Sequence, residues 1–224
     1  MRFSIIVPML NEAPGLPGLL ARLTELERQG CEILIVDGGS DDGSVSLAER
    51  AGFRVLASQK GRARQMNLGA AQATGDVLLF LHADTLLPEG ALTSVRQTML
   101  KTAAVWGRFD VLIDGAHPML RVIATLMNHR SRWTGIATGD QAIFVTRKAF
   151  DAVGGYPDQP LMEDIELSNR LRALARPACI PTPVRTSGRR WESRGVWRTV
   201  LLMWRLRWAY WRGTPAEQLA QRYR

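Results

Sequence analysis

Five consecutive apolar residues, Val77 to Leu81, are followed at once by the polar sequence His82-Ala83-Asp84. A short apolar run bounded by polar residues predicts a parallel strand that is buried on both faces. In an open α/β sheet the ligand binds outside the carboxyl ends of the strands, so we expect His82 and Asp84 to face a ligand crevice. An Asp after a strand often only caps the next turn, and this structural role is the alternative for Asp84.

Strand-like and helix-like segments alternate along the rest of the chain. The pattern predicts further strands at 3–8, 31–36, 53–57 and 106–113, and a glycine-rich turn that enters a strand within 135–145. It predicts helices at 16–26, 44–50, 62–73, 119–128, 163–174 and 196–211. Strands that alternate with helices predict an α/β fold with a mostly parallel, doubly wound sheet and helices on both faces.

Polar and charged side chains gather in the loops that follow the first four predicted strands. Right-handed connections place these loops at the same edge of the sheet. They bring together seven polar side chains, namely Asn11, Glu12, Asp37, Arg62, Arg64, His82 and Asp84. An acid after the second strand suits a ribose or base N–H, the arginines suit phosphate, and Asp84 could hold a divalent cation that bridges to it. The loops therefore indicate a nucleoside diphosphate ligand.

Charge divides the 224 residues into two parts. Residues 1–184 hold 19 basic and 19 acidic side chains, whereas residues 185–224 hold ten arginines and two glutamates and carry the whole net charge of +8. We therefore expect one α/β domain over 1–184 and a basic, Trp/Arg-rich helical extension over 185–224. The two cysteines and the lack of a leader-like or membrane-spanning apolar run predict a cytoplasmic protein without a disulfide.

Four motifs resemble the family-2 glycosyltransferases of the GT-A fold, over roughly three quarters of the chain. They are SIIVPMLNEA at 4–13, IVDGGSDDGS at 35–44, NLGAAQATGDVLLFLHADT at 67–85, and GDQAIFVTRKAFDAVGGYPD with MEDIELSNRL at 139–171. The order and spacing of these motifs are specific, although each alone is weak. More narrowly, the chain resembles the short stand-alone bacterial branch associated with radical-SAM, selenium-related or arsenosugar gene neighbourhoods.

The resemblance implies an inverting transfer of a sugar from a nucleotide sugar, expected to be a UDP-sugar, to an unidentified acceptor. It implies Asp164 as the general base, with Glu163 beside it. The implied nucleotide-sugar-binding residues are Pro8, Asn11, Glu12, Asp37, Gly38, Arg62, Arg64, Asn67, His82, Ala83 and Asp84. The implied acceptor-side residues are Gly139, Asp140, Gln141, Arg190 and Trp191. A capping role in the first turn of a helix is the alternative for Glu163 and Asp164.

Two positions depart from the family pattern. His82 replaces the first acid of the DXD motif, in which Asp84 would bind the metal, Mn²⁺ or Mg²⁺. Imidazole suits Mn²⁺ better than Mg²⁺, so His82 is either a second metal ligand or a hydrogen-bond donor behind the site. The usual arginine before Asn67 is replaced as well, since the sequence reads QMNLG at 65–69. The arginine that faces the diphosphate would then be Arg62 or Arg64.

The predicted helix at 196–211 carries a stripe of large apolar side chains with a spacing of four and three residues, namely Trp197, Leu201, Trp204, Trp208 and Trp211. Arginines recur every seven residues beside it. Such a helix could lie on the inner face of a membrane, with its arginines on anionic phosphates. The alternative is that the stripe packs on the domain itself or on a second subunit.

Two other classes of protein make different predictions. A nucleotidyltransferase of related fold would carry a glycine-rich basic loop after the first strand, where this chain has Met9-Leu10-Asn11-Glu12. A nucleic-acid binder would use the basic tail. The acids of the expected crevice would repel a phosphate backbone, so we do not expect nucleic acid as a partner.

Overall fold

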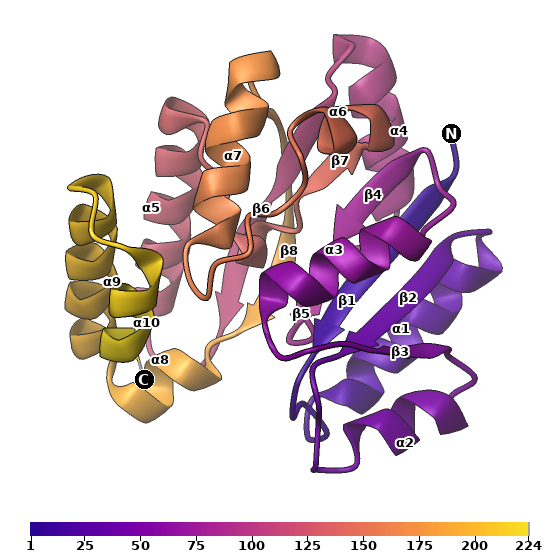
Figure 1. Cartoon of the computed structure of the whole chain (residues 1–224), viewed down its shortest axis with the longest axis horizontal. Coiled ribbons are helices and arrows are strands. Elements are labelled where there is room, and N and C mark those ends of the chain that lie inside the picture. Colours follow the sequence, from indigo (N-terminus) through magenta and orange to yellow (C-terminus); the bar gives the residue numbers. More distant parts are fainter. Residues whose placement is uncertain (224) are drawn as a thin grey trace.

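The computed structural model describes residues 1–223, and Arg224, the last residue of the expected basic extension, lies outside them. Eight strands form one sheet in the order β3-β2-β1-β4-β7-β6-β8-β5 (Figure 1). Their bounds are β1 (Phe3–Met9), β2 (Glu32–Asp37), β3 (Val55–Ala57), β4 (Val77–Phe80), β5 (Thr85–Leu86), β6 (Trp106–Asp114), β7 (Phe144–Thr146) and β8 (Ala178–Ser187). Strands β3, β2, β1 and β4 are parallel, as expected, and β7 runs antiparallel to both β4 and β6.

Helices cover both faces of this sheet. On one face, α1 (Leu16–Arg28), α2 (Ser44–Arg50), α4 (Ala91–Thr102) and α5 (Met119–Thr134) close a large apolar core. On the other, a second core includes α3 (Arg62–Gln72), α6 (Arg147–Ala152) and α7 (Glu163–Leu174). Strand β1 shows why two cores form, because Ile5 and Val7 enter the first core and Ile6 enters the second. The expected α/β sheet with helices on both faces is therefore confirmed.

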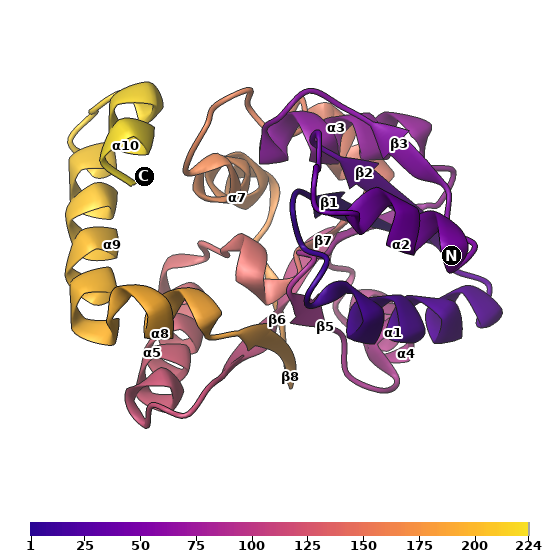
Figure 2. The ribbon, with the colours of Figure 1, turned by 90° about the horizontal axis from the view of Figure 1, so that it is seen from below.

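The remaining helices stand at one end of the molecule. They are α8 (Arg189–Arg194), α9 (Val196–Trp211) and α10 (Ala216–Tyr223), and both views place α9 and α10 at the end opposite α1 and α2 (Figures 1 and 2). A small apolar cluster of Leu161, Met162, Leu206 and Leu219 holds α9 and α10 against the segment before α7. No helix in residues 1–223 is both long and apolar enough to cross a membrane.

Pro8 lies inside β1, although the sequence suggested that the strand stops there. Proline lacks an N–H group, so it fits a strand only where no neighbour needs that donor. Strand β4 pairs with β1 only as far as Ile6, and Pro8 is paired with Val36 of β2 on the other side. Because β4 no longer pairs with β1 at this position, the missing N–H of Pro8 costs no hydrogen bond to β4. Strand β1 therefore continues through Pro8 and ends one residue later, at Met9.

Candidate active site

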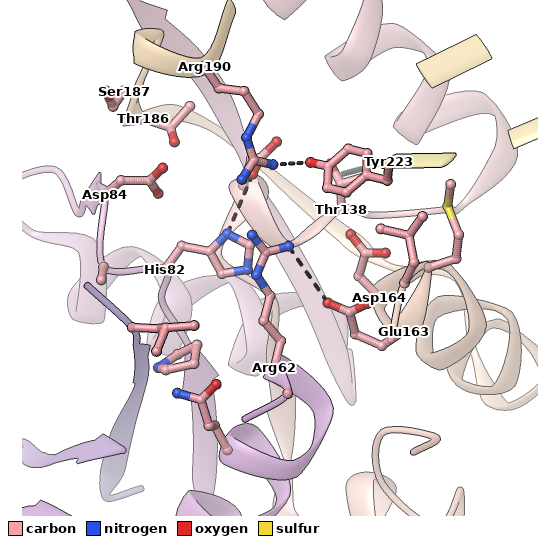
Figure 3. A pocket seen from close by; sticks show the side chains of 18 of the residues that line it. Arg62, His82, Asp84, Thr138, Glu163, Asp164, Thr186, Ser187, Arg190 and Tyr223 are labelled. Atoms are coloured by element: carbon pink, nitrogen blue, oxygen red, sulfur yellow. Dashed lines mark hydrogen bonds and ion pairs between the residues drawn. The ribbon is translucent and has the colours of Figure 1, made fainter. Parts of the chain in front are cut away.

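A cavity of about 400 Å³ opens at the carboxyl ends of β1 and β4 (Figure 3). Eleven of the residues singled out from the sequence line it, namely Pro8, Glu12, Arg62, His82, Ala83, Asp84, Asp140, Glu163, Asp164, Arg190 and Trp191. They come from the ends of two strands, from the first turns of α3 and α7, from the 3₁₀ turn Gly139–Gln141 and from α8. The topology of the sheet thus brings together residues that are up to 183 positions apart.

The other seven residues singled out from the sequence do not line this cavity. Asn11, Asp37 and Gly38 lie at or after the ends of β1 and β2, and Asn67 lies in α3. The carboxylate of Asp37 accepts the N–H groups of Gly39 and Ser40, at 2.8 and 3.0 Å. The side chain of Asn11 accepts the N–H of Asp41 at 3.0 Å. Gly38 lies against the side chain of Gln65, and Asn67 exchanges two hydrogen bonds with the backbone of Tyr156.

Arg64, Gly139 and Gln141 are the remaining three. Arg64 is exposed and pairs with Asp158 at 2.8 Å, so Arg62 is the arginine of the two that lines the cavity. Gly139 and Gln141 form the 3₁₀ turn, which the Thr138 side chain caps. Gly139 packs so closely against the His82 ring that a Cβ there would overlap it.

His82 and Asp140 face each other inside the cavity, with 3.5 Å between Nδ1 and Oδ1. Burial is the largest single effect on the pKa of His82 and lowers it, but the hydrogen bond to Asp140 and the negative charges of Asp140 and Asp84 together raise this pKa above its usual value. Burial raises the pKa of Asp140, but the hydrogen bond and charge of His82, together with the charges of Arg62 and Arg190, lower it below its usual value. The pair therefore favours an imidazolium hydrogen-bonded to a carboxylate.

Glu163 and Asp164 are adjacent acids at the start of α7. Burial is the largest cause that raises the pKa of each, and the negative charge of Asp164 raises that of Glu163 further. Asp164 accepts the N–H of Gly139 at 2.8 Å and that of Ile165 at 2.7 Å, which fixes its carboxylate. Arg62 lies 4.0 Å from Glu163 and keeps a positive charge, because these acids raise its pKa despite desolvation. The site thus holds a fixed acid of raised proton affinity beside a cation.

Asp84 presents a half-buried carboxylate to the same cavity, and its Oδ1 accepts a 3.3 Å hydrogen bond from the Thr85 hydroxyl. In the described part of the chain, no three or more His, Cys, Asp or Glu side chains are grouped so that they could hold a metal ion. A carboxylate oxygen is still a good ligand for Mg²⁺ or Mn²⁺, which proteins commonly bind through one or two carboxylates plus substrate phosphates. Asp84 fits a metal whose other ligands come from a bound diphosphate.

The C-terminal helices close one side of the cavity. Arg190 of α8 donates a hydrogen bond to the Tyr223 hydroxyl of α10 and stacks on its ring, and Arg189 pairs with Glu12 at 2.8 Å. Thr199, Met203 and Arg207 of α9 line the same space. No sequence pattern had indicated Tyr223 or these three residues of α9 as part of the site. The spacing of four along α9 could have shown that Thr199, Met203 and Arg207 share the face opposite the tryptophans.

A second cavity, of about 950 Å³, lies behind Asp164 between α5, α7, α9 and α10. Ile165 and Arg207 line both cavities. Arg130 of α5 lines the second one, and its Nε and one terminal nitrogen are buried without a hydrogen-bond partner. Burial lowers the pKa of Arg130, and Asp164 and Asp140 are near enough to oppose that shift. The second cavity therefore offers a poorly solvated cation close to the proposed base.

A cavity lined by acids and arginines at the carboxyl ends of the strands is where open α/β sheets bind their ligands. Residues 4–156 match the family model of Glycosyl transferase family 2, which is more than half of the chain. The protein belongs to this family of glycosyltransferases.

Curated relatives and solved structures agree with this assignment. The chain is 35% identical over 176 residues to a PGL/p-HBAD biosynthesis glycosyltransferase of Mycobacterium bovis. The aligned region covers 69% of this chain and 62% of the relative. It is also 35% identical, over 98 residues, to an undecaprenyl-phosphate 4-deoxy-4-formamido-L-arabinose transferase of Enterobacter sp., covering 39% of this chain and 30% of that protein. The chain thus spans less than two thirds of the length of these relatives.

Two solved structures share the fold at low sequence identity. Residues 1–349 of S. aureus TarS in complex with UDP-GlcNAc superpose with a TM-score of 0.67 at 17% identity, covering 84% of this chain and 58% of that one. The mannosyltransferase PcManGT of Pyrobaculum calidifontis, in complex with GDP-Man and Mn²⁺, gives a TM-score of 0.64 at 23% identity and covers 83% and 56%. These likenesses establish the GT-A-like fold of the chain.

Proposed function

We propose that the protein transfers a sugar, with inversion, from a nucleoside diphosphate sugar to a hydroxyl group of an acceptor. One observation carries the proposal: Asp84 of the loop after β4, Arg62 of α3 and Asp164 of α7 converge on one cavity in a chain of this family. Phosphate recognition, metal binding and proton removal each need one of these groups, and the cavity supplies all three. We expect the donor to be a UDP-sugar.

The nucleotide would lie along the loops after β1 and β2, where Glu12 lines the cavity and Asp37 and Asn11 hold the loop backbone by hydrogen bonds. Arg62 and Arg190 would face the diphosphate from opposite sides of the cavity (Figure 3). A divalent cation, Mn²⁺ or Mg²⁺, would be held by Asp84 and the diphosphate oxygens, and it would neutralise charge on the leaving group. The Mn²⁺ in the PcManGT complex supports this part of the proposal.

Asp164 would take the proton of the acceptor hydroxyl. A general base must be ionised, fixed in place and able to bind a proton near the working pH. Two backbone N–H groups fix this carboxylate, and its raised pKa brings its proton affinity closer to neutrality. Inversion needs a single base on the side of the sugar opposite the diphosphate, and Asp164 fits this role.

We propose that His82 is a hydrogen-bond donor rather than a metal ligand. One ring nitrogen faces Asp140, and the other end of the ring packs against Gly139. A protonated imidazole cannot coordinate a metal, and the raised pKa of His82 favours this form. His82 would then hold the turn that donates the Gly139 N–H to Asp164.

The acceptor would approach through the second cavity, since Ile165 and Arg207 connect it with the first. Asp140 and Trp191 would line the acceptor side, as the sequence suggests, and Gly139 and Gln141 would support it from behind. The placement of the chain in the short bacterial branch stays a prediction, as does the division into segments 1–184 and 185–224. Strand β8 crosses that division and ends at Ser187.

The proposal can be tested by measuring donor binding and nucleoside diphosphate release separately. Asp164→Asn should lower turnover by at least about 100-fold while donor affinity stays the same. Asp84→Asn should weaken donor binding in the presence of Mn²⁺ and abolish the gain that Mn²⁺ gives the parent protein. Asp151→Asn, at an exposed acid of α6, is the matched control and should change neither quantity. Release of pyrophosphate instead of nucleoside diphosphate would contradict the proposal and indicate a nucleotidyltransferase.

A further inference from the structure

Helix α9 has two faces of different character. Val196, Thr199 and Leu206 are buried on the inner face. On the outer face the tryptophans at 197, 204, 208 and 211 are between 61 and 80% exposed, and Leu201 is 56% exposed. The structure therefore shows that the aromatic stripe does not pack on the protein's own domain. Scattered exposed apolar residues are normal, but five large ones along one stripe form a patch that needs a partner.

A second helix carries a similar stripe at the same end of the molecule. Val122, Leu126 and Trp133 of α5 are 46, 59 and 77% exposed, again with a spacing that puts them on one side. Both views place α5 and α9 at the end away from α2 and β3 (Figures 1 and 2). Neither α5 nor α9 contains a single acidic residue.

Arginines lie along one side of the tryptophan stripe of α9. Arg198, Arg205 and Arg212 are all exposed, and Arg212 lies over the Trp208 ring at 5.2 Å. None of these three makes an ion pair with a described residue. An indole ring places its apolar body in the acyl boundary and its N–H group in the wet headgroup layer, while arginine binds lipid phosphates. The outer face of α9 therefore offers both exposed indole rings for the acyl boundary and exposed arginines for lipid phosphates.

We propose that the outer face of α9 docks the protein on an anionic lipid bilayer, with the helix lying in the plane of the interface. A second copy of the chain is a poorer occupant, because a symmetric contact through α9 would bring two sets of arginines together without an acid on either helix. With 16 residues, of which three are arginine, α9 is too short and too charged to span a bilayer. An in-plane position is the arrangement that suits such a helix.

This proposal does not depend on the proposed function, but it has a consequence for it. The inner face of α9 lines the candidate active site through Thr199, Met203 and Arg207, while the outer face would rest on lipid. One helix thus separates the cavity from the bilayer surface. Lipid binding and catalysis can be measured independently, so failure of one does not imply failure of the other.

Sedimentation of the full chain with large vesicles tests the proposal. The protein should sediment with vesicles of phosphatidylcholine that contain about one third phosphatidylglycerol, and much less with pure phosphatidylcholine. The double variant Trp204→Ala/Trp208→Ala should bind at least about 10-fold more weakly. Because both side chains are exposed, its circular dichroism spectrum and thermal unfolding should match those of the parent.

A matched pair of arginine variants separates a specific surface from net charge alone. Arg198→Gln/Arg205→Gln/Arg212→Gln should lower vesicle affinity by roughly 100-fold, since each arginine near an anionic surface contributes a factor of about five. The triple variant Arg28→Gln/Arg50→Gln/Arg54→Gln removes the same charge from exposed positions on α1, on α2 and before β3, and should leave the affinity nearly unchanged.

Three results would overturn the proposal. The first is no sedimentation with anionic vesicles at low salt. The second is an equal loss of binding in the two triple variants, which would indicate a general charge effect. The third is a solution dimer, seen by analytical ultracentrifugation, that Trp204→Ala/Trp208→Ala dissociates, because the stripe would then be an interface between two copies.

Discussion

Glu163 shows how a single residue in the candidate active site lowers the stability of the fold. Its side chain is buried beside Asp164, so its pKa is raised and its charged form is disfavoured in the folded protein. Such a carboxyl destabilises the fold at a pH above its folded pKa, and the cost disappears when it is protonated. Active sites commonly retain groups that destabilise the fold in this way, because the function requires a buried charged side chain.

Glu163→Gln should therefore raise the melting temperature at pH 7. A gain of about 1 kcal/mol corresponds to about 2–4 °C in a chain of this size. The difference from the parent should vanish at acidic pH, where Glu163 is protonated in both states. Glu166→Gln is the control on the same turn, since Glu166 pairs with Arg170 at 3.0 Å and should gain nothing. An equal gain in both variants would show that burial of Glu163 is not the cause.

The pH dependence of catalysis should report Asp164. The base acts when ionised, so kcat/KM should be full above its folded pKa and fall as the pH drops through that value. Burial and the negative charge of Asp140 raise the pKa of Asp164, so the acid limb should have its midpoint above about 3.9, the usual value for Asp. A rate profile measured from pH 4 to pH 8 would check this. A flat profile across that range would argue against Asp164 as the base.

At the scale of elements, local patterns predicted those helices and strands whose residues bury one continuous face. Helix α1 is an example, because its five leucines at helical spacing are all buried. Helix α5 extends six residues beyond its predicted end, through His129 to Thr134, where the polar residues 128–132 had hidden the continuation. The strand predicted at 53–57 is shorter, since only Val55–Ala57 pairs with β2.

Strand β8 had no prediction, and its two prolines explain why. Pro181 and Pro183 lack N–H groups and are atypical of a strand inside a sheet. The register with β6 shifts here, so that Phe109 pairs with Ile180 and Asp110 with Pro183. On the other side, β5 pairs only with Arg185 and Thr186. The prolines are tolerated because of a bulge and a short neighbour, and both depend on the tertiary structure.

Helix α10 was also unpredicted, and Tyr223 gives it a role that can be tested. Its hydroxyl accepts a hydrogen bond from Arg190, and its ring lies 5.2 Å from that guanidinium. Tyr223→Phe removes only the hydrogen bond, worth about 1 kcal/mol, and should raise KM for the donor by about 5-fold. Tyr223→Ala also removes the stacking and should raise it further. Equal KM values in the parent and both variants would show that Tyr223 does not position Arg190.

At the scale of the whole molecule, the candidate site joins the two ends of the chain. The sequence placed Asp84, Arg62 and Glu12 at one edge because parallel strands share that edge. It could not place Tyr223 or Arg207 there, since no local pattern fixes how a C-terminal helix packs back on a sheet. The resemblance to a family suggested Arg190 and Trp191, and the structure shows that the same segment also pairs Arg189 with Glu12.

Donor binding should consequently stabilise segments that are remote in sequence. A nucleotide sugar that contacts Arg62 and Asp84 on one side and Arg190 on the other holds both sides closed. With UDP and Mn²⁺ at about 100 times the dissociation constant, amide hydrogen exchange should slow by up to roughly 100-fold wherever opening breaks the site. We expect this protection at 82–86 and again at 189–223, which exchange mass spectrometry resolves by peptide.

Helix α4 (Ala91–Thr102) is the internal control, because it contributes no residue to the cavity and should exchange at the same rate with and without ligand. Protection at 82–86 without any change at 189–223 would mean that the C-terminal helices lie beside the nucleotide site without taking part in it. Protection of both segments would mean that the donor links the sheet to the C-terminal helices, of which α9 carries the tryptophan stripe. Binding of the donor in the cavity and the position of the tryptophan stripe would then be coupled through α9, because the inner face of this helix lines the cavity and its outer face carries the stripe.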